Sequence, residues 1–164
     1  MTKQVEKYIK ENLPYFKSIP HKYRYSGVKD KSWSLLSDYV RCRDYILFKG
    51  KCVATGRKID HWREGDPGHY VSMAGHGVES GFDPMNIHLQ SKSSNGWGGN
   101  ADGHLFGLEL DRRYGSGTAK KLRQARPLVK DDDWYHLRKI EDIWGKFQAL
   151  KKEHPDFDYP PYLK

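Results

Sequence analysis

The sequence predicts an α+β fold in which helices flank a short, β-rich middle segment, and three observations support this class. Apolar residues recur at helical spacing before residue 50 and again after residue 104. Between these stretches, short β-prone pieces alternate with glycine, proline, aspartate and asparagine, as in a small hairpin. The chain has 164 residues, 37% of them hydrophobic, which suits a single domain over residues 1–164. Its expected parts are an N-terminal helical part, residues 1–50, a middle core, residues 51–115, and C-terminal helices with an extended tail, residues 116–164.

The N-terminal part is expected to hold two helices. The first covers residues 3–11, and a polar and aromatic stretch, residues 16–31, follows it as a loop. The second helix begins with Ser32 as its N-cap, because hydroxyl side chains satisfy the first backbone N–H groups. It runs to Phe48, and the nearby Gly50 ends it.

The remaining parts change from a strand-like pattern to a helical one. Four β-like pieces cover residues 52–54, 58–62, 68–72 and 86–90. A flexible loop is expected at residues 91–99. Helices are expected at residues 105–114, 118–125 and 133–152, the last with an apolar stripe for core packing. The tail, residues 154–164, contains three prolines and should be extended.

The charge balance favours an anionic partner. The net charge is +8 and the isoelectric point is about 9.4, so nucleic acid is the expected partner, with simple solubility as the alternative. No run of about 18 apolar residues is present, so we expect no membrane partner. The first residues lack the apolar core of a signal peptide, which predicts a cytoplasmic protein. The two cysteines, Cys42 and Cys52, exclude a disulfide framework and a four-cysteine zinc site.

The middle part is rich in residues that bind metals or move protons. Five of the eight histidines lie between residues 60 and 105, interleaved with aspartate and asparagine. A lone histidine is more often structural than catalytic, so spacing alone leaves both interpretations open. The sequence contains no P-loop, no nucleophile elbow and no zinc-protease helix motif.

A series of short motifs carries a resemblance. In chain order they are Arg41-Cys42-Arg43-Asp44, Cys52-Val53-Ala54-Thr55-Gly56, Asp66-Pro67-Gly68-His69-Tyr70, Asn86-Ile87-His88, Gln90 with Asn95, Gly99-Asn100 and Arg113-Tyr114-Gly115. Their order and spacing resemble the NinG/Rap family of lambdoid phage recombination proteins, over about half of the chain. That family is similar to the His-Me finger, or HNH-like, nucleases, so the resemblance implies a ββα-metal core flanked by helices.

The resemblance implies an endonuclease that cuts branched or recombination-intermediate DNA with one divalent metal, Mg²⁺ or Mn²⁺. It makes His69 the general base, with Asn86 bracing the loop and orienting the imidazole. Asp66 and Asn95 become oxygen ligands of the metal. The residues expected to contact DNA are His88, Lys92, Arg41 and Arg43, the two arginines because they give the second helix a basic side.

This chain also departs from the family pattern, which has two pairs of zinc-binding cysteines. The first pair becomes Cys52 with Thr55, and the second becomes Ser91 with Ser94, so we expect no structural zinc. The family's Ser-Gly-Asn serine becomes Gly98, and the loop before it is one residue shorter. Apolar packing by nearby aromatics is expected to replace the zinc; the candidates are Trp62, Tyr70, Phe82 and Trp97.

Plainer interpretations stay open for every site residue. His69 could be a structural hairpin residue, Asp66 could open a turn, and Asn95 with its following glycine could form one. Asn86 could be a strand-edge residue, and His88 and the basic helix side could have no ligand. Two alternative functions follow: a DNA-binding recombination or architectural factor without cleavage activity, and a phage-encoded protein-binding regulator of a host factor. A homodimer would suit a two-fold DNA junction.

Overall fold

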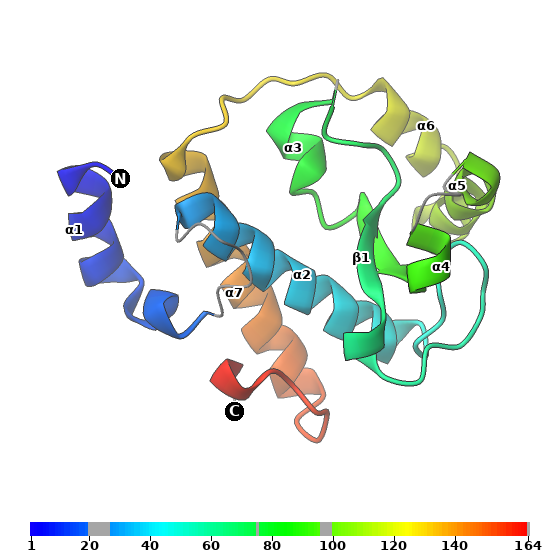
Figure 1. Cartoon of the computed structure of the whole chain (residues 1–164), viewed down its shortest axis with the longest axis horizontal. Helices are drawn as coiled ribbons and strands as arrows, with labels where there is room; N and C mark the ends of the chain where they lie inside the picture. Colours follow the sequence, from blue (N-terminus) through cyan, green and yellow to red (C-terminus); the bar gives the residue numbers. More distant parts are fainter. Residues whose placement is uncertain (20–26, 75, 96–99, 164) are drawn as a thin grey trace. The chain divides into compact units, whose positions relative to one another are not determined.

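The computed structural model describes residues 1–19, 27–74, 76–95 and 100–163, with the side chains of residues 100–102 set aside. This described part is mostly helical and contains one two-stranded antiparallel sheet, which confirms the mixed class of the predicted fold (Figure 1). By their contacts the residues form two compact units: unit 1 comprises residues 1–39 and 130–164, and unit 2 comprises residues 40–129. The units do not follow the three consecutive parts expected from the sequence.

Unit 1 is helical. Its elements are α1 (Lys3–Asn12), the 3-10 turn η1 (Pro14–Ser18), the first part of α2 (Val28–Leu47), α7 (Asp133–Glu153) and the 3-10 turn η3 (Pro161–Leu163). Helix α2 starts four residues earlier than expected, and Ser32 is buried inside it, so its prediction as an N-cap was wrong. Val28 is itself buried and stands seven residues before the buried Leu35, so the buried face of the helix reaches its first residue.

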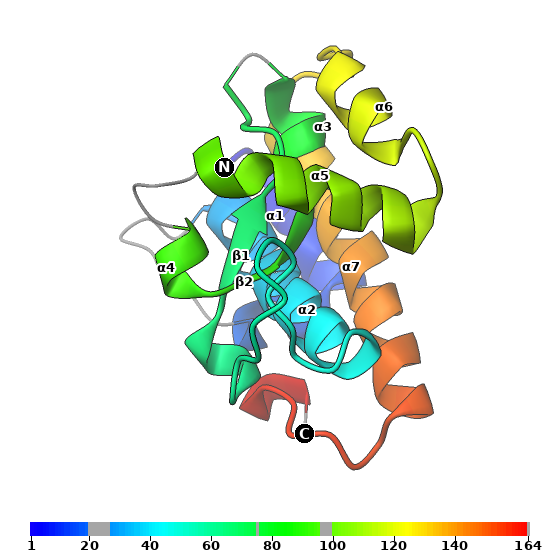
Figure 2. The same cartoon turned by 90° about the vertical axis from the view of Figure 1, so that its right-hand side faces the viewer.

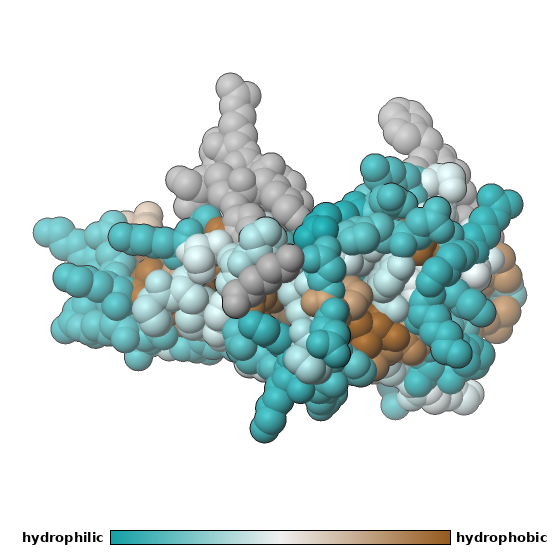
Figure 3. Space-filling view, turned by 90° about the horizontal axis from the view of Figure 1, so that it is seen from below, coloured by the Kyte–Doolittle hydropathy of each residue, from teal (hydrophilic) through white to brown (hydrophobic). Residues whose placement is uncertain are grey.

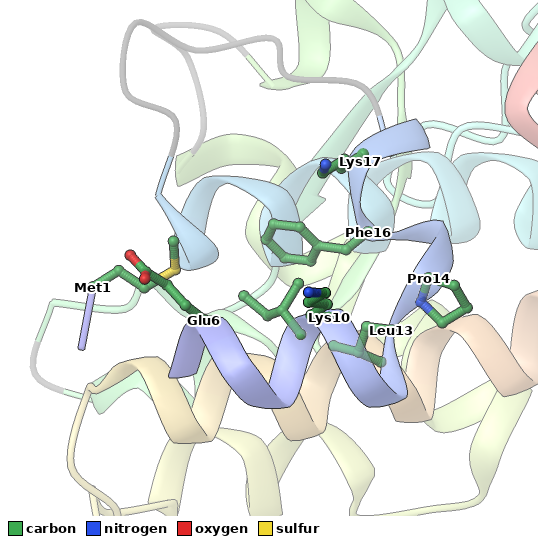
Figure 4. Close-up of a pocket in the computed structure, with 8 residues that line it drawn as sticks. Met1, Glu6, Lys10, Leu13, Pro14, Phe16 and Lys17 are labelled. Carbon is green, nitrogen blue, oxygen red and sulfur yellow. The ribbon is translucent and has the colours of Figure 1, made fainter. Parts of the chain in front are cut away.

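The core of unit 1 lies along α7, where the expected stripe is buried: Leu137, Ile140, Ile143, Phe147 and Leu150. Asp132 caps this helix by accepting a hydrogen bond from the backbone N–H of Tyr135. The tail is not simply extended, because Tyr159 is buried and its hydroxyl donates to the Leu150 carbonyl at 3.0 Å. A groove of about 450 Å³ lies beside α1 and η1, with Leu13 and Phe16 among its lining residues (Figure 4).

Unit 2 contains the sheet. Its elements are the second part of α2, the 3-10 turn η2 (Trp62–Glu64), β1 (Asp66–His69), α3 (Gly77–Gly81), β2 (Ile87–Gln90), α4 (Lys92–Asn95), α5 (Asn100–Tyr114) and α6 (Thr118–Gln124). Strands β1 and β2 pair antiparallel, with Asp66 opposite Gln90 and His69 opposite Ile87. Figure 2 shows this ribbon beside α4 and α5. Leu89, Phe106 and Leu110 belong to its apolar core.

Two of the four expected β pieces form the ribbon, whereas residues 52–54 and 58–62 form turns joined by a single bridge between Lys51 and Lys58. Gly56 adopts a φ of 69°, which turns the chain back before a strand can extend. Helix α3 was not expected, and α4 replaces the first part of the predicted loop; the rest of that loop, residues 96–99, lies outside the described residues.

No helix among the described residues is long and apolar enough to cross a membrane. Hydrophilic side chains cover most of the surface visible in Figure 3, with only small brown apolar areas between them. This surface agrees with the low mean hydropathy of −0.89.

Candidate functional site

His69 is the last residue of β1, and a backbone carbonyl holds its imidazole at Nε2. The Nε2 atom lies 3.0 Å from the carbonyl oxygen of Gly81, so Nε2–H donates and the ring lone pair resides on Nδ1. Partial burial lowers the pKa of His69, while the Gly81 carbonyl partly offsets that effect. The imidazole is therefore neutral near pH 7, the form that a general base requires.

Asn86 precedes β2 and braces the backbone around His69. Its amide Nδ2 donates to the carbonyls of Val71 at 2.9 Å and Ser80 at 2.8 Å. Its Oδ1 accepts from the Val71 N–H at 2.9 Å, and the whole side chain is buried. Since Ser80 directly precedes Gly81, this amide fixes the carbonyl that holds the imidazole. Asn86 thus ties the backbone at Val71, two residues after His69, to the backbone at Ser80.

Three side chains that carry oxygen, those of Asp66, Gln90 and Asn95, gather along β1 between its first residue and Gly68. Asn95 Nδ2 lies 3.4 Å from Asp66 Oδ2, which leaves Asn95 Oδ1 turned toward Gly68. A Cβ built on Gly68 would lie 1.5 Å from Gln90 Oε1 and 2.8 Å from Asn95 Oδ1. Gln90 is fixed in this orientation because its Nε2 donates to Ser94 Oγ at 3.3 Å. The missing side chain of Gly68 therefore creates the space that these oxygens occupy.

This donor set fits a hard divalent cation. Carboxylate and amide oxygens are the ligands that Mg²⁺ and Mn²⁺ prefer, and Mg²⁺ usually keeps several waters besides one or two protein carboxylates. Among the described residues, no group of three or more histidine, cysteine, aspartate and glutamate side chains could hold a metal ion. The site would thus depend on amide oxygens, and Gln90 is a candidate that sequence reasoning did not assign. Its direct pairing with Asp66 across the ribbon was the missing signal.

The two halves of the site stand apart along β1. His69 and Asp66 are three residues apart in an extended strand, so their Cα atoms are separated by about 10 Å. Because successive side chains of a strand point to opposite faces, Asp66 and Gly68 share one face of β1 and the His69 side chain leaves from the other.

His88 and Arg43, both expected to contact DNA, lie in the interior of unit 2. His88 is 0% exposed and Arg43 is 7% exposed. His88 Nδ1 donates to Asp44 Oδ2 at 2.8 Å, and the Arg43 guanidinium bonds to Asp44 Oδ1 and to the Ile87 carbonyl. In this conformation neither side chain can reach a phosphate. The expectation that His88 and Arg43 contact DNA is therefore corrected. Their charges and polar atoms are satisfied inside the protein.

The carboxylate of Asp44 is the centre of this buried cluster. Burial alone would raise its pKa, but Arg43 and His88 hold the pKa of Asp44 well below its usual range. Asp44 Oδ2 also accepts from the backbone N–H of Leu89 at 2.8 Å, and Arg113 lies 3.6 Å from the same oxygen. Helix α2, strand β2 and helix α5 are thereby joined. Three separate motif pieces of the resemblance meet at this point.

The other two expected DNA contacts remain at the surface. Lys92 is exposed at the start of α4, one turn before Asn95. Arg41 is half-buried, and its guanidinium carbon lies 5.3 Å from the ring centroid of Trp62. Arg63 contacts the same ring at 4.4 Å. Trp62 thus contacts two cations beside the start of β1.

The positions that would hold zinc in the family lie on two adjacent turns. Burial raises the pKa of the Cys52 thiol. Hydrogen bonds from the Thr55 hydroxyl and from the backbone N–H groups of Ser91, Thr55 and Ala54 outweigh this effect and lower the pKa to about 7. The turns pack on a core that contains Phe106 and Leu110, with Tyr70 against it. Of the aromatics expected to replace zinc, Tyr70 thus packs here, while Trp97 lies outside the described residues.

The loop that carries Gly98 and Gly99, and the side chain of Asn100, also lie outside the described residues. The Gly-Asn piece of the resemblance therefore has no structural counterpart here. The remaining pieces occupy α2, the ribbon and α5, as described above. No protein-family model, no curated protein and no solved structure matches the chain.

Proposed function

We propose that this protein is a metal-dependent DNA endonuclease with a His-Me finger core, acting on branched or recombination-intermediate DNA. One observation carries the proposal: a single two-stranded ribbon carries both a neutral histidine and a cluster of side-chain oxygens of the kind that bind Mg²⁺. A net charge of +8 supports a polyanionic substrate. The preference for branched DNA rests on the resemblance alone.

His69 supplies the base in this mechanism. The lone pair on Nδ1 takes a proton from a water molecule as the water oxygen bonds to phosphorus. The bond between phosphorus and the leaving strand's oxygen then breaks, and that oxygen gains a proton from solvent. The Gly81 carbonyl, which accepts from Nε2–H, stabilises the positive charge that develops on the ring. The products are a phosphate monoester and a free hydroxyl.

Asp66, Asn95 and Gln90 provide the other half of the site. Their oxygens would hold one divalent cation, which when bound stabilises charge on the scissile phosphate and the leaving oxygen. Asp66 contributes the negative charge, and Gly68 keeps the amide oxygens close by having no side chain. The paired strands fix these groups relative to His69 without any flexible connection.

The test is cleavage of three DNA substrates, a four-way junction, a flap and a linear duplex, each with Mg²⁺, Mn²⁺ or chelator. We expect metal-dependent cleavage that favours the branched substrates and disappears in His69→Ala. If the protein binds these DNAs and cuts none, the alternative of a DNA-binding recombination factor replaces the proposal. If it fails to bind DNA even at low salt, the protein-binding regulator becomes the better interpretation.

A further inference from the structure

A basic pocket lies in unit 2, and none of the residues proposed above for catalysis or metal binding lines it. It has a volume of about 440 Å³ and lies between the end of α2 and the last turns of α5. Its lining residues are Leu47, Phe48, Lys49, Lys51, Glu109, Arg112 and Arg113. Four cationic side chains and one carboxylate give this lining a formal charge of +3.

The four cations differ in how they are engaged. The Arg113 side chain is only 2% exposed, lies 3.6 Å from the Phe48 ring centroid and pairs with Glu109. Arg112 also pairs with Glu109, yet its side chain is 69% exposed. Lys49 and Lys51 are exposed, and their ammonium groups have no partner among the residues that the structure describes. These two lysines are the groups that an incoming anion would meet.

The pocket continues into a line of cations interleaved with aromatic rings. Lys58 Nζ donates to the Lys49 carbonyl at 2.6 Å and lies 5.0 Å from the Tyr45 ring centroid. The His61 ring follows at 6.4 Å from Tyr45 and at 5.7 Å from Trp62, on which Arg41 and Arg63 stack. We call this line the basic track, defined by Arg41, Arg63, Lys58, Lys49, Lys51 and Arg112.

We infer that the basic track holds one duplex arm of the DNA substrate, with a backbone phosphate seated in the pocket between Lys49 and Lys51. This inference rests on the DNA-binding part of the proposed function and not on cleavage. The track begins at η2, which ends two residues before Asp66 of the ribbon, so an arm leaving the cut site meets it first. From Arg41 to Leu47 it follows α2 for about 9 Å, roughly three base-pair steps of duplex.

The chemistry of the track fits a phosphate backbone and not a base sequence. Aromatic rings hold the two guanidinium groups in place, so less side-chain entropy is lost when they pair with phosphates. Lysines add point charges without directional preference. A different role is to neutralise the carbonyl ends of α2 and α5, where cations stabilise a helix. That role predicts a loss of thermal stability and no loss of DNA affinity.

The test compares two double variants in a His69→Ala background, which binds DNA without cutting it. K49Q/K51Q removes the two pocket cations, and K120Q/K121Q removes two exposed cations of α6 in the same unit. Affinity for a junction and for a linear duplex is measured by fluorescence anisotropy across a salt series, without divalent metal. A melting curve accompanies each variant.

We expect K49Q/K51Q to weaken binding about tenfold at moderate salt and to reduce the log–log salt slope by about 0.9, since the pocket seats one phosphate and each duplex phosphate contact contributes about 0.9. The K120Q/K121Q pair should change neither quantity comparably. Equal effects of both pairs would mean that affinity follows net charge, and the inference would be overturned. Lower stability with unchanged affinity would also overturn it, in favour of helix-end neutralisation.

Three further outcomes distinguish the ligand of the pocket from the function of the protein. Inorganic pyrophosphate that stabilises the parent protein but not K49Q/K51Q, without competing for DNA, would assign the pocket to a small anion and overturn the inference. Wild-type protein that binds DNA through the track but never cleaves it would contradict only the proposed endonuclease. Cleavage that persists with no effect of K49Q/K51Q on DNA affinity would contradict only the track.

Discussion

Two histidines on one small ribbon have opposite environments. His88, on β2, is fully buried and donates to Asp44 among two arginines. His69, on β1, is only partly buried and is held at Nε2 by one backbone carbonyl. Burial lowers the pKa of both, so both are neutral near pH 7. The two imidazoles therefore differ in exposure and in hydrogen-bond partners and not in protonation state. Exposure and partners decide which imidazole could serve as a base.

The strongest test of this comparison is His69→Ala. Loss of a positioned general base lowers the rate by on the order of 10² to 10⁴. DNA affinity should stay nearly unchanged, because surface cations supply most of the ground-state binding. Single-turnover cleavage and anisotropy on the same preparation measure both quantities. Cleavage at the wild-type rate would place His69 with His88 as a structural residue.

The buried side of the comparison is tested by Asp44→Asn. Removing one partner from a buried charge cluster costs about 3–5 kcal/mol, because buried Arg43 loses its carboxylate and Arg113 keeps only its pairing with Glu109. The matched control is Asp142→Asn, an exposed partner of Lys146 on α7, which should cost only about 0.3–0.5 kcal/mol. Urea unfolding of both variants provides the free energies. Similar losses in the two would remove the central role assigned to Asp44.

A third change, Gly68→Ala, sharpens the description of the oxygen cluster. Its Cβ would collide with Gln90 Oε1 and crowd Asn95 Oδ1, so both amides must move. We expect metal affinity and cleavage to fall by at least about tenfold, since second contacts to a metal site are worth 10–100-fold. Gly103→Ala is the control, because nothing lies within 4 Å of its added carbon. If cleavage survives unchanged in G68A, the cluster around Gly68 is not the metal site.

Acidification should weaken the fold through its buried imidazoles. Burial lowers the pKa of His88 and of His136 below the unfolded value of about 6.5. The unfolded chain then binds protons that the folded chain rejects, so stability is complete above about pH 6.5 and is lost as pH falls through the folded-state pKa. Melting curves between pH 8 and pH 5 measure this loss. His136→Gln should flatten part of the dependence, and an unchanged profile would contradict the assignment.

The smallest expected effect is that of a chelator. Thr55, Ser91 and Ser94 have neutral hydroxyls where thiolates would be needed, so we predict no structural zinc and no change in melting with a strong chelator. Elemental analysis of the purified protein is the direct measurement. The triple variant T55C/S91C/S94C supplies the contrast, because its two adjacent turns should then bind one zinc. Zinc bound tightly by the natural chain, with unfolding on chelation, would refute the prediction.

Much of the helical framework and the ribbon could be predicted from the sequence, because periodicity is a local signal. The motif around His69 likewise predicted that this histidine lies in a hairpin, and it does lie in the ribbon. The side chains of Asp66 and Asn95, predicted to act together, are within 3.4 Å of each other. Arg43 and His88 were misplaced because polar residues normally lie at the surface. Their burial depends on an ion pair between residues 44 and 88, which no local pattern reveals.

The turn beside the basic pocket holds one residue in an unfavourable backbone conformation. Lys49 has a φ of 57°, and it is the only residue other than glycine with a positive φ in the part of the chain described. A lysine held in the left-handed region costs about 1 kcal/mol relative to glycine. Lys49→Gly should therefore make the protein more resistant to heat while removing a charge from the track. The turn would be an instance of local strain tolerated because it presents a cation to a ligand, a compromise between durability and recognition.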